Sequence, residues 1–381
     1  MADPIQLVRE LERGLPELLD QVGTLVSAES PSSDPDAVCA CGEVLDSLVD
    51  SQLGVSAERV EVDGVTHLRW ILGRPRVLLV GHLDTVWPHG TLQRRPFERR
   101  DDRLLGPGVF DMKAGLVQAV TAVAMLDDPT GIELLVTSDE EIGSPTSREL
   151  IIEGARRAEA VLVFEGAAGD AVKTERKGLS RYTLRTAGRA AHAGLEPERG
   201  ANALVDAAHQ VLAAEALARP ELGTSVTPTL ATAGTASNVV PASATVEIDV
   251  RAATYEEQLR VHQELCSWVA SLPGVELTVE GEINRQPMDA VSTRELFGRV
   301  GRAAETIGVT PPPGVGVGGV SDANLAAEAG APVIDGLGAV GGGAHAEDEH
   351  VIVERIPERT ALAAVLIGDL LADPVRRRPT L

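Results

Sequence analysis

The spacing of apolar residues predicts alternating strands and helices in the first part of the chain. Leucines and valines recur at helical spacing over residues 5–28, and the Ser-Asp-Pro-Asp sequence at 33–36 opens a second helix. Strand-like apolar runs follow at 57–61, 66–71, 76–81, 132–137 and 160–164, and helical patterns at 112–126 and 146–156. This order predicts an α/β sheet covered by helices on both faces, whose functional residues lie in loops at the carboxyl ends of the strands.

The pattern changes near residue 178 and returns to the α/β type near residue 287. Between these points we expect strands at 180–186, 225–233, 243–252 and 275–282, with helices near 200–218 and 255–271. They would form a four-stranded antiparallel sheet with two helices, an α+β domain of about 110 residues. The α/β pattern resumes with helices at 292–307, 321–330 and 356–372, a loop at 310–319 and a strand at 331–334. We therefore predict one α/β domain, residues 1–177 and 287–381, with an α+β domain inserted at residues 178–286.

Composition and charge exclude several functional classes. The 381 residues are enough for two domains, and 57 acidic against 34 basic residues give a formal net charge of −23. A surface this acidic repels nucleic acids and anionic membranes, so we expect neither as a partner. The sequence shows no apolar stretch of membrane-spanning length and no export signal at its start, and residues 376–378 form a short basic tail. The three cysteines lack a C-x-x-C spacing, so we expect reduced thiols in a cytoplasmic protein.

Residues of the types that bind metal ions follow the predicted core strands. These residues are His82, Asp84, Asp111, Glu140, Glu141, Glu165 and His345. Two of them differ in context, because Asp111 precedes a predicted helix and His345 lies in a glycine-rich loop, where backbone can approach a site closely. We expect the set to meet at one edge of the sheet. Two imidazoles and three carboxylates suit a pair of divalent metal ions bridged by one carboxylate, and a bridging hydroxide brings the total charge close to neutral.

Short motifs spread along nearly the whole chain carry a family resemblance. They are GHLDTV at 81–86, GPGVFDMKAG at 106–115, SDEEIGS at 138–144, AHAG at 191–194, SNVVP at 237–241 and GGVSD at 318–322. With these motifs the chain resembles the M20 family of dinuclear zinc peptidases, and within it the glutamate carboxypeptidase (carboxypeptidase G2-like) branch. The resemblance implies a zinc-exopeptidase-like catalytic domain with a mixed sheet, and an inserted α+β domain used for dimerisation.

The resemblance also implies which residues hold each metal ion. Asp111 would be the bridging ligand. His82 and Glu165 would complete the site of one ion, and Glu141 and His345 the site of the other. The two ions and a water that bridges them would then form the reacting centre.

Three further residues receive catalytic roles from the same resemblance. Asp84 would accept a hydrogen bond from the far nitrogen of His82 and fix its tautomer. Glu140 would be the general base and acid that moves a proton from the water to the leaving nitrogen. His192, in the inserted domain, would reach across a dimer interface and stabilise the tetrahedral oxyanion.

Four residues match substrate-contacting positions of the family. Asn238 and Arg251 match positions of the inserted domain that contact the substrate or its carboxylate. Lys173 and Arg285 align loosely with glutamate-contacting positions of the carboxypeptidase branch. The sequence Asn-Arg-Gln-Pro at 284–287 departs from the usual Arg-Pro pair, so the preferred C-terminal residue stays open.

These observations predict a cytoplasmic, homodimeric hydrolase with two divalent metal ions, expected to be Zn²⁺, with Co²⁺ and Mn²⁺ as alternatives. Its substrate would be a small molecule or peptide with a free carboxylate, cleaved at the amide bond between an acyl or peptidyl group and a C-terminal amino acid. An N-acyl-amino-acid deacylase or specialised-metabolite amidohydrolase of the same family stays open as an alternative. A catalytically silent binding member is the other alternative, although such members usually lack the base or a metal ligand.

Overall fold

The computed structural model describes residues 4–375, so the basic tail at 376–378 lies outside the described residues. The chain forms two compact units. Unit 1 contains Met1–Glu175, Ala290–Gly316 and Ser321–Leu381, and unit 2 contains Arg176–Asp289 and Val317–Val320. Within residues 4–375, no helix is long and apolar enough to cross a membrane.

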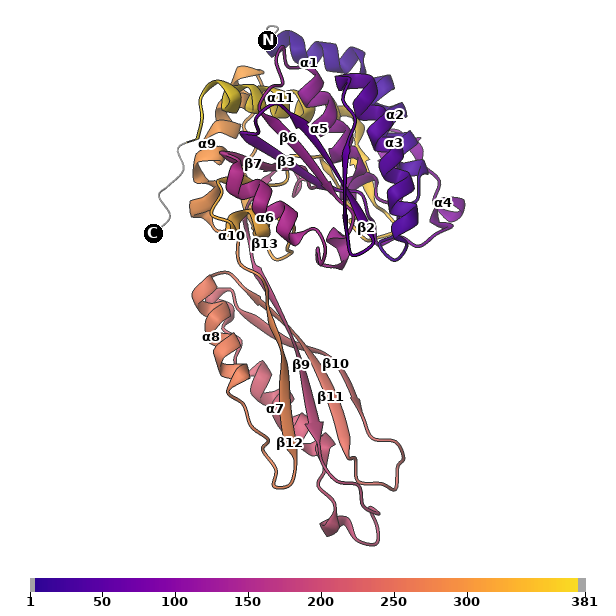
Figure 1. The fold of residues 1–381 in the computed structure, drawn as a ribbon, viewed down its shortest axis with the longest axis vertical. Helices are drawn as coiled ribbons and strands as arrows, with labels where there is room; N and C mark the ends of the chain where they lie inside the picture. Colours follow the sequence, from indigo (N-terminus) through magenta and orange to yellow (C-terminus); the bar gives the residue numbers. More distant parts are fainter. Residues whose placement is uncertain (1–3, 376–381) are drawn as a thin grey trace. The chain divides into compact units, whose positions relative to one another are not determined.

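Unit 1 is built on a six-stranded mixed sheet (Figure 1). Its strands, in spatial order, are β1 (Glu58–Val62), β2 (Val65–Leu72), β6 (Ile132–Thr137), β3 (Val77–His82), β7 (Ala160–Val163) and β14 (Val333–Ile334). The neighbours from β6 to β14 pair in parallel, whereas β2 is antiparallel to both β1 and β6. Every residue of β3, β6 and β7 is buried, as expected for parallel strands covered on both faces.

Helices cover both faces of this sheet, which confirms the predicted fold class. The helices of unit 1 are α1 (Pro4–Arg13), α2 (Leu15–Ser27), α3 (Pro35–Leu53), α4 (Thr91–Arg94), α5 (Ala114–Ala124), α6 (Arg148–Arg157), α9 (Ala290–Thr306), α10 (Asp322–Glu328) and α11 (Ile356–Ala372). The crossover through α5 leads from β3 to β6, and the crossover through α6 leads back past β3 to β7. Because such crossovers are right-handed, the two helices lie on opposite faces. Gly115 lets α5 approach β7 closely, since a Cβ there would lie 2.2 Å from the carbonyl oxygen of Phe164.

Several short elements near the sheet were not predicted. One small sheet contains β15 (Gly341–Gly342), β16 (His350–Ile352), β5 (Arg103–Leu105) and β4 (Glu98–Arg100), in that order. A second pairs β13 (Gly314–Val317), inside the expected loop at 310–319, with β8 (Val172–Arg176). Single turns of unit 1 are η1 (Val109–Lys113), η2 (Glu140–Ile142) and η5 (Val353–Arg355), and those of unit 2 are η3 (Pro197–Arg199) and η4 (Pro220–Leu222). The helical pattern at 5–28 also proved to be two helices, because the chain breaks at Gly14.

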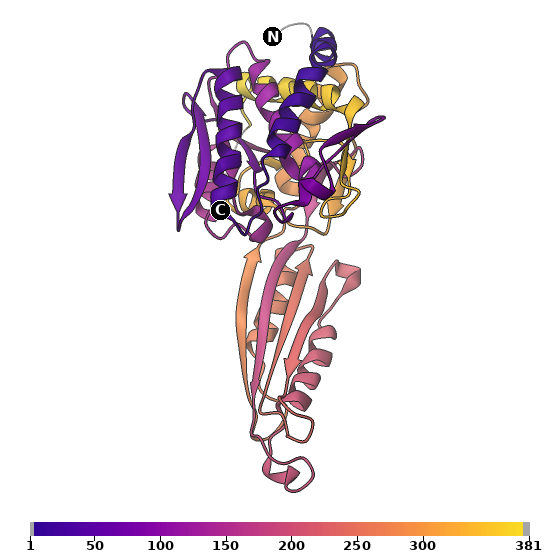
Figure 2. The same cartoon turned by 90° about the vertical axis from the view of Figure 1, so that its right-hand side faces the viewer.

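Unit 2 is a four-stranded antiparallel sheet with two helices, as the sequence pattern predicts. The strands β10 (Ser225–Ala233), β11 (Ser243–Ala252), β9 (Gly178–Ala187) and β12 (Glu276–Arg285) lie in that order. Its helices, α7 (Ala203–Glu215) and α8 (Tyr255–Cys266), pack on the same face of the sheet (Figure 2). Alternate residues of β9 and β11, among them Leu184, Val246 and Ile248, point into the core between sheet and helices.

Candidate metal centre

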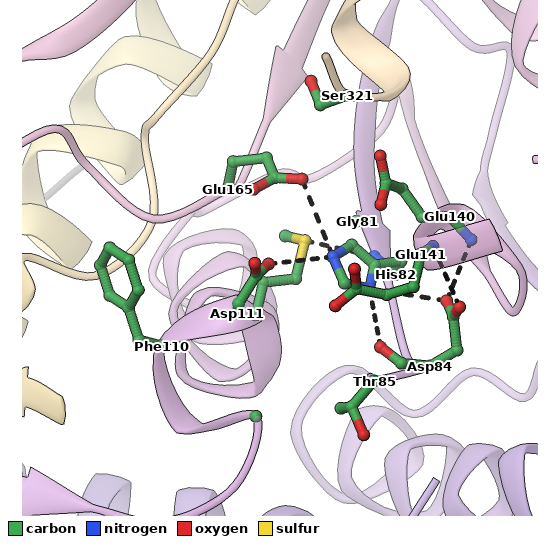
Figure 3. A network of polar contacts seen from close by, with 12 residues as sticks. Gly81, His82, Asp84, Thr85, Phe110, Asp111, Glu140, Glu141, Glu165 and Ser321 are labelled. Carbon is green, nitrogen blue, oxygen red and sulfur yellow. Dashed lines mark hydrogen bonds and ion pairs between the residues drawn. The ribbon is translucent and has the colours of Figure 1, made fainter. Parts of the chain in front are cut away.

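The metal-ligand candidates of unit 1 converge at the carboxyl end of its sheet (Figure 3). His82 is the last residue of β3, Glu140 and Glu141 lie in η2 just after β6, and Glu165 follows β7. Asp111 lies in η1, at the entrance to α5. Parallel neighbouring strands end at one edge, which is why residues far apart in sequence meet here.

The two carboxylate oxygens of Asp111 face two different imidazoles. Oδ1 lies 3.2 Å from Nε2 of His82, and Oδ2 lies 3.4 Å from Nε2 of His345. The same nitrogen of His82 is 3.7 Å from Oε1 of Glu165. The same nitrogen of His345 is 3.0 Å from Oε2 of Glu141. Two groups of donors therefore share Asp111, one with His82 and Glu165 and the other with His345 and Glu141.

These separations fit the donor spacing around a tetrahedral metal ion. Two ligand atoms, each about 2.0–2.1 Å from such an ion, lie about 3.3 Å from one another. The four contacts above range from 3.0 to 3.7 Å. Glu140 also has an oxygen in this region, because Glu140, His82 and Glu165 each offer an atom within 4.8 Å of the others. Nitrogen and carboxylate donors in this number suit Zn²⁺, Co²⁺ or Mn²⁺.

Neighbouring carboxylates raise the pKa of both imidazoles. Hydrogen bonds to Asp111 and Glu141 raise the pKa of His345 to about 10. Burial lowers the pKa of His82, but hydrogen bonds with Asp111 and Asp84 outweigh it and raise that pKa well above its usual range. Burial likewise favours the neutral form of Asp111, yet the two histidines hold its pKa well below the usual value. Protonated imidazoles therefore carry the positive charge that this cluster of acids requires.

Asp84 organises the loop that carries Glu140 and Glu141. Its carboxylate is fully buried and accepts hydrogen bonds from the main-chain N–H groups of Glu140 and Glu141, both at 3.1 Å, and from Ser32 Oγ at 2.8 Å. Nδ1 of His82 donates to the main-chain oxygen of Asp84 at 2.9 Å, and the carboxylate lies farther away, at 3.5 Å. His82 and Asp84 are therefore in contact, as expected, but the shorter of the two distances is to the main-chain carbonyl oxygen of Asp84 and the longer one is to its carboxylate. Either contact leaves Nε2 of His82 directed at Asp111.

The acid before Glu140 has a separate, structural task. Asp139 is buried and accepts hydrogen bonds from Thr146 N and Oγ1 at 2.7 Å and from Ser147 Oγ at 2.5 Å. His67 lies beside it, where its Nδ1 accepts from Ser138 N at 3.2 Å and its Nε2 contacts Thr146 Oγ1 at 3.0 Å. Burial lowers the pKa of His67, so the neutral imidazole fits this arrangement. These contacts fix the turn from which Glu140 and Glu141 project.

Two buried charged residues of the site were not found from the sequence. Glu349 is fully buried and accepts hydrogen bonds from three main-chain N–H groups of the Asp111 segment. Burial raises the pKa of Glu349, and those N–H groups oppose the shift. Lys113 is also buried and donates to the carbonyl oxygen of Ala28 at 2.7 Å, and burial lowers its pKa. The local sequence contains no signal for Glu349, because its hydrogen-bond partners lie 238 or more residues away.

Of the substrate-contacting candidates, only Lys173 lies in unit 1. Its Nζ is 3.9 Å from Oε2 of Glu165, so it adds positive charge at the edge of the metal-ligand cluster. In unit 2, Arg251 forms two hydrogen bonds with Asp249, at 2.8 and 3.1 Å. Arg285 lies in β12 with only 1 % of its surface exposed. Substrate contact by these residues stays a prediction.

His192 and Asn238 lie side by side in unit 2. His192 forms an isolated antiparallel β-bridge with Val239, and Ala193 N donates to the carbonyl oxygen of Asn238 at 2.9 Å. The His192 side chain is exposed, and its Nδ1 accepts from the N–H groups of Gly194 and Leu195, both at 3.2 Å. With Nδ1 used as an acceptor, the proton of the neutral ring resides on Nε2, which becomes a hydrogen-bond donor.

Comparisons with known proteins agree with this geometry. The family model described as Peptidase family M20/M25/M40 matches residues 78–369. Carboxypeptidase G2 of Pseudomonas sp. (strain RS-16) is 32% identical over 377 residues, which cover 93% of this chain and 89% of the relative. N-acetyl-L-citrulline deacetylase of Xanthomonas campestris is 34% identical over 193 residues, 50% of this chain and 52% of that enzyme. The crystal structure of aminopeptidase PepT from Bacillus cereus has the same fold, with a TM-score of 0.72 at 22% identity, covering 94% of this chain and 99% of that one.

Metal loading of the metal-free protein should release protons near neutral pH. Raised pKa values favour the protonated forms of His82 and His345 near neutral pH. Binding of a metal ion requires the neutral rings, so these protons must leave. We expect about one proton from each imidazole. Titration calorimetry with Zn²⁺ in two buffers of different ionisation enthalpy measures the number.

The substitution His345→Asn should lower the proton count by about one and reduce the bound metal per chain. His209→Asn is the matched control, because His209 is exposed in α7 of unit 2. Equal proton release from the wild type and His345→Asn would contradict the assignment of His345 as a ligand.

Proposed function

The chain belongs to peptidase family M20/M25/M40, and from this premise we propose that it is a metal-dependent exohydrolase acting on amide bonds. It would cleave the bond between an acyl or peptidyl group and a C-terminal amino acid that keeps a free carboxylate. The observation that carries the proposal is Asp111, whose two oxygens face two imidazoles at 3.2 and 3.4 Å beside a set of further carboxylates. Carboxypeptidase G2, similar over 93% of the chain, supports the choice of bond.

We assign the metal ligands from the two donor groups around Asp111. His82 and Glu165 would hold one ion with Asp111, and His345 and Glu141 would hold the other. Zn²⁺ is the proposed metal, and Co²⁺ and Mn²⁺ suit the same donors. When bound, such ions polarise a carbonyl and lower the pKa of water.

Glu140 is proposed as the general base and acid. It lies next to Glu141 in the tight turn η2, where successive side chains point about 120° apart because such a turn has three residues per repeat. Asp84 holds the N–H groups of both residues, so their directions are fixed together. Glu140 would take a proton from the attacking water as the water oxygen bonds to the carbonyl carbon. The same proton would then reach the leaving nitrogen as the carbon–nitrogen bond breaks.

His192 is proposed as the donor that stabilises the oxyanion, acting in the partner's site of a homodimer formed through unit 2. Its Nδ1 accepts two main-chain hydrogen bonds, which leaves the Nε2–H group available as the donor. Asn238 beside it, with Arg251, Lys173 and Arg285, would contact the substrate or its carboxylate. For a chain with free Cys39, Cys41 and Cys266, we propose a cytoplasmic location.

A deacylase is the second candidate, because N-acetyl-L-citrulline deacetylase is 34% identical over half of the chain. The two activities share the metal ligands and differ in the acyl group. A silent binding protein is disfavoured, because the proposed base and all five proposed ligands are present and converge.

A substrate panel tests the proposed function and separates the candidates. N-acetyl, N-benzoyl and dipeptidyl derivatives of glutamate, alanine and citrulline would be assayed with Zn²⁺-loaded protein, each beside its C-terminal amide. We expect hydrolysis of the free acids, a strong loss with the amides, and loss of all activity on chelation with recovery when Zn²⁺ returns. A preference for acetyl over larger acyl groups would favour the deacylase. Equal hydrolysis of acids and amides would contradict an exohydrolase that requires the free carboxylate.

Glu140 and Glu141 form a matched pair for testing the two assigned roles. Glu140→Gln should keep two metal ions and lose about 10²–10⁴ in kcat, because it removes proton transfer. Glu141→Gln should instead lose metal from one site. Elemental analysis with steady-state kinetics checks both variants. Loss of metal from Glu140→Gln with retention in Glu141→Gln would show that the roles are exchanged.

The role of His192 can be tested by complementation between subunits. His192→Ala should bind metal normally and lose about 10²–10³ in kcat, the usual effect of removing one oxyanion donor. Heterodimers of His192→Ala and Glu140→Ala chains, isolated with two affinity tags, should recover about half of the wild-type rate, because one of the two sites is intact. Heterodimers no more active than either parent would mean that His192 does not serve the partner's site.

A further inference from the structure

We propose that Glu349 is a positioning residue. It would hold the segments that carry Asp111, His82 and His345 in the relative positions that metal binding needs, an inference that rests on the function proposed above. Glu349 lies directly before β16 and its side chain is fully buried. It offers no atom to the donor groups described above, so it is not proposed as a metal ligand.

The carboxylate of Glu349 accepts hydrogen bonds from four N–H groups. Oε1 accepts from the main-chain N–H groups of Phe110 and Asp111, at 3.0 and 3.1 Å. Oε2 accepts from Gly108 N at 2.9 Å and from the indole Nε1 of Trp87 at 2.8 Å. All four partners are donors, so both oxygens must act as acceptors, and an amide at this position cannot satisfy them. Three of these bonds fix the backbone of the segment that presents Asp111.

The fourth bond connects the segment that carries His82. Trp87 lies five residues after His82, in the loop that leaves β3. Its indole ring is in turn covered by the guanidinium of Arg95, 4.3 Å from the ring centroid. Through Trp87, the carboxylate of Glu349 ties this loop to the Asp111 segment. The distance between His82 and Asp111 therefore depends on a residue that touches neither imidazole.

The segment that carries His345 is connected through the backbone of Glu349 itself. His345 lies four residues earlier, and Glu349 N donates to the carbonyl oxygen of Ala346 at 3.1 Å. Gly343 has φ +74°, and a Cβ there would lie 2.8 Å from Glu349 N, so the loop is closely folded against this residue. Displacement of Glu349 is therefore transmitted to His345 as well as to Asp111.

The substitution Glu349→Gln tests this role with little change of shape. In the glutamine side chain, an NH₂ group replaces one of the two carboxylate oxygens. This group faces the two N–H donors that the oxygen accepted from, so two of the four hydrogen bonds are lost. We expect the affinity for Co²⁺ to fall by roughly 10–100-fold, the usual effect of removing a residue that orients metal ligands. The Co²⁺ absorption spectrum should also change, because Asp111 bridges the proposed sites. Trp87→Phe removes one donor only, and should weaken Co²⁺ binding in the same direction by a smaller factor.

Glu133→Gln is the matched control for a purely structural effect. Glu133 is a buried carboxylate near the other end of β6, where it pairs with Arg157 at 3.1 Å. This variant should lower the melting temperature and keep the wild-type Co²⁺ affinity and spectrum. If Glu349→Gln binds Co²⁺ as tightly as the wild type with an unchanged spectrum, the positioning role is overturned. If Glu349→Gln does not fold, the Co²⁺ affinity and spectrum of Trp87→Phe test the positioning role in the same way. Failure of the wild type to bind two ions would instead overturn the proposed function.

Discussion

The site depends on holding several carboxylates together against their mutual repulsion. Glu140 and Glu165 each offer an oxygen within 4.8 Å of the other and of His82. Two full charges at this distance repel by roughly 3 kcal/mol at an effective dielectric constant of about 20. Asp111 adds another carboxylate and is balanced by two imidazoles. Positive charge among the carboxylates relieves this repulsion: the raised pKa values of His82 and His345 favour their protonated forms, and divalent ions would act more strongly.

Three buried acids outside the candidate metal-ligand groups hold this arrangement in place. Asp84 accepts the N–H groups of Glu140 and Glu141, Asp139 fixes the turn that follows, and Glu349 accepts three N–H groups around Asp111. In each case the hydrogen bonds fix the backbone, and the backbone determines where the candidate ligand side chain points. These buried carboxylates thus position the backbone that carries Glu140, Glu141 and Asp111.

Much of the fold could be predicted because core strands and helices leave strong apolar patterns. The runs that become β3, β6 and β7 are continuous, so the residues that follow them could be recognised as candidates for one site, and the structure brings these residues together. Helix α11 covers the range predicted for it. The short strands β15 and β16 have too few residues for a pattern, and the break at Gly14 interrupts helical spacing that continues on both sides. Glu349 was missed because its partners lie 238 to 262 residues earlier, so local sequence does not distinguish it from a solvated acid.

The proposed function requires that Asp111 lie between two metal ions, each completed by one histidine and one glutamate. The most direct test is a crystal structure of the Zn²⁺-loaded protein with anomalous data collected at the zinc edge. We predict two anomalous peaks, one beside each oxygen of Asp111, with His82 and Glu165 at one and His345 and Glu141 at the other. A single peak, or two peaks that do not share Asp111, would contradict a dinuclear site bridged by Asp111.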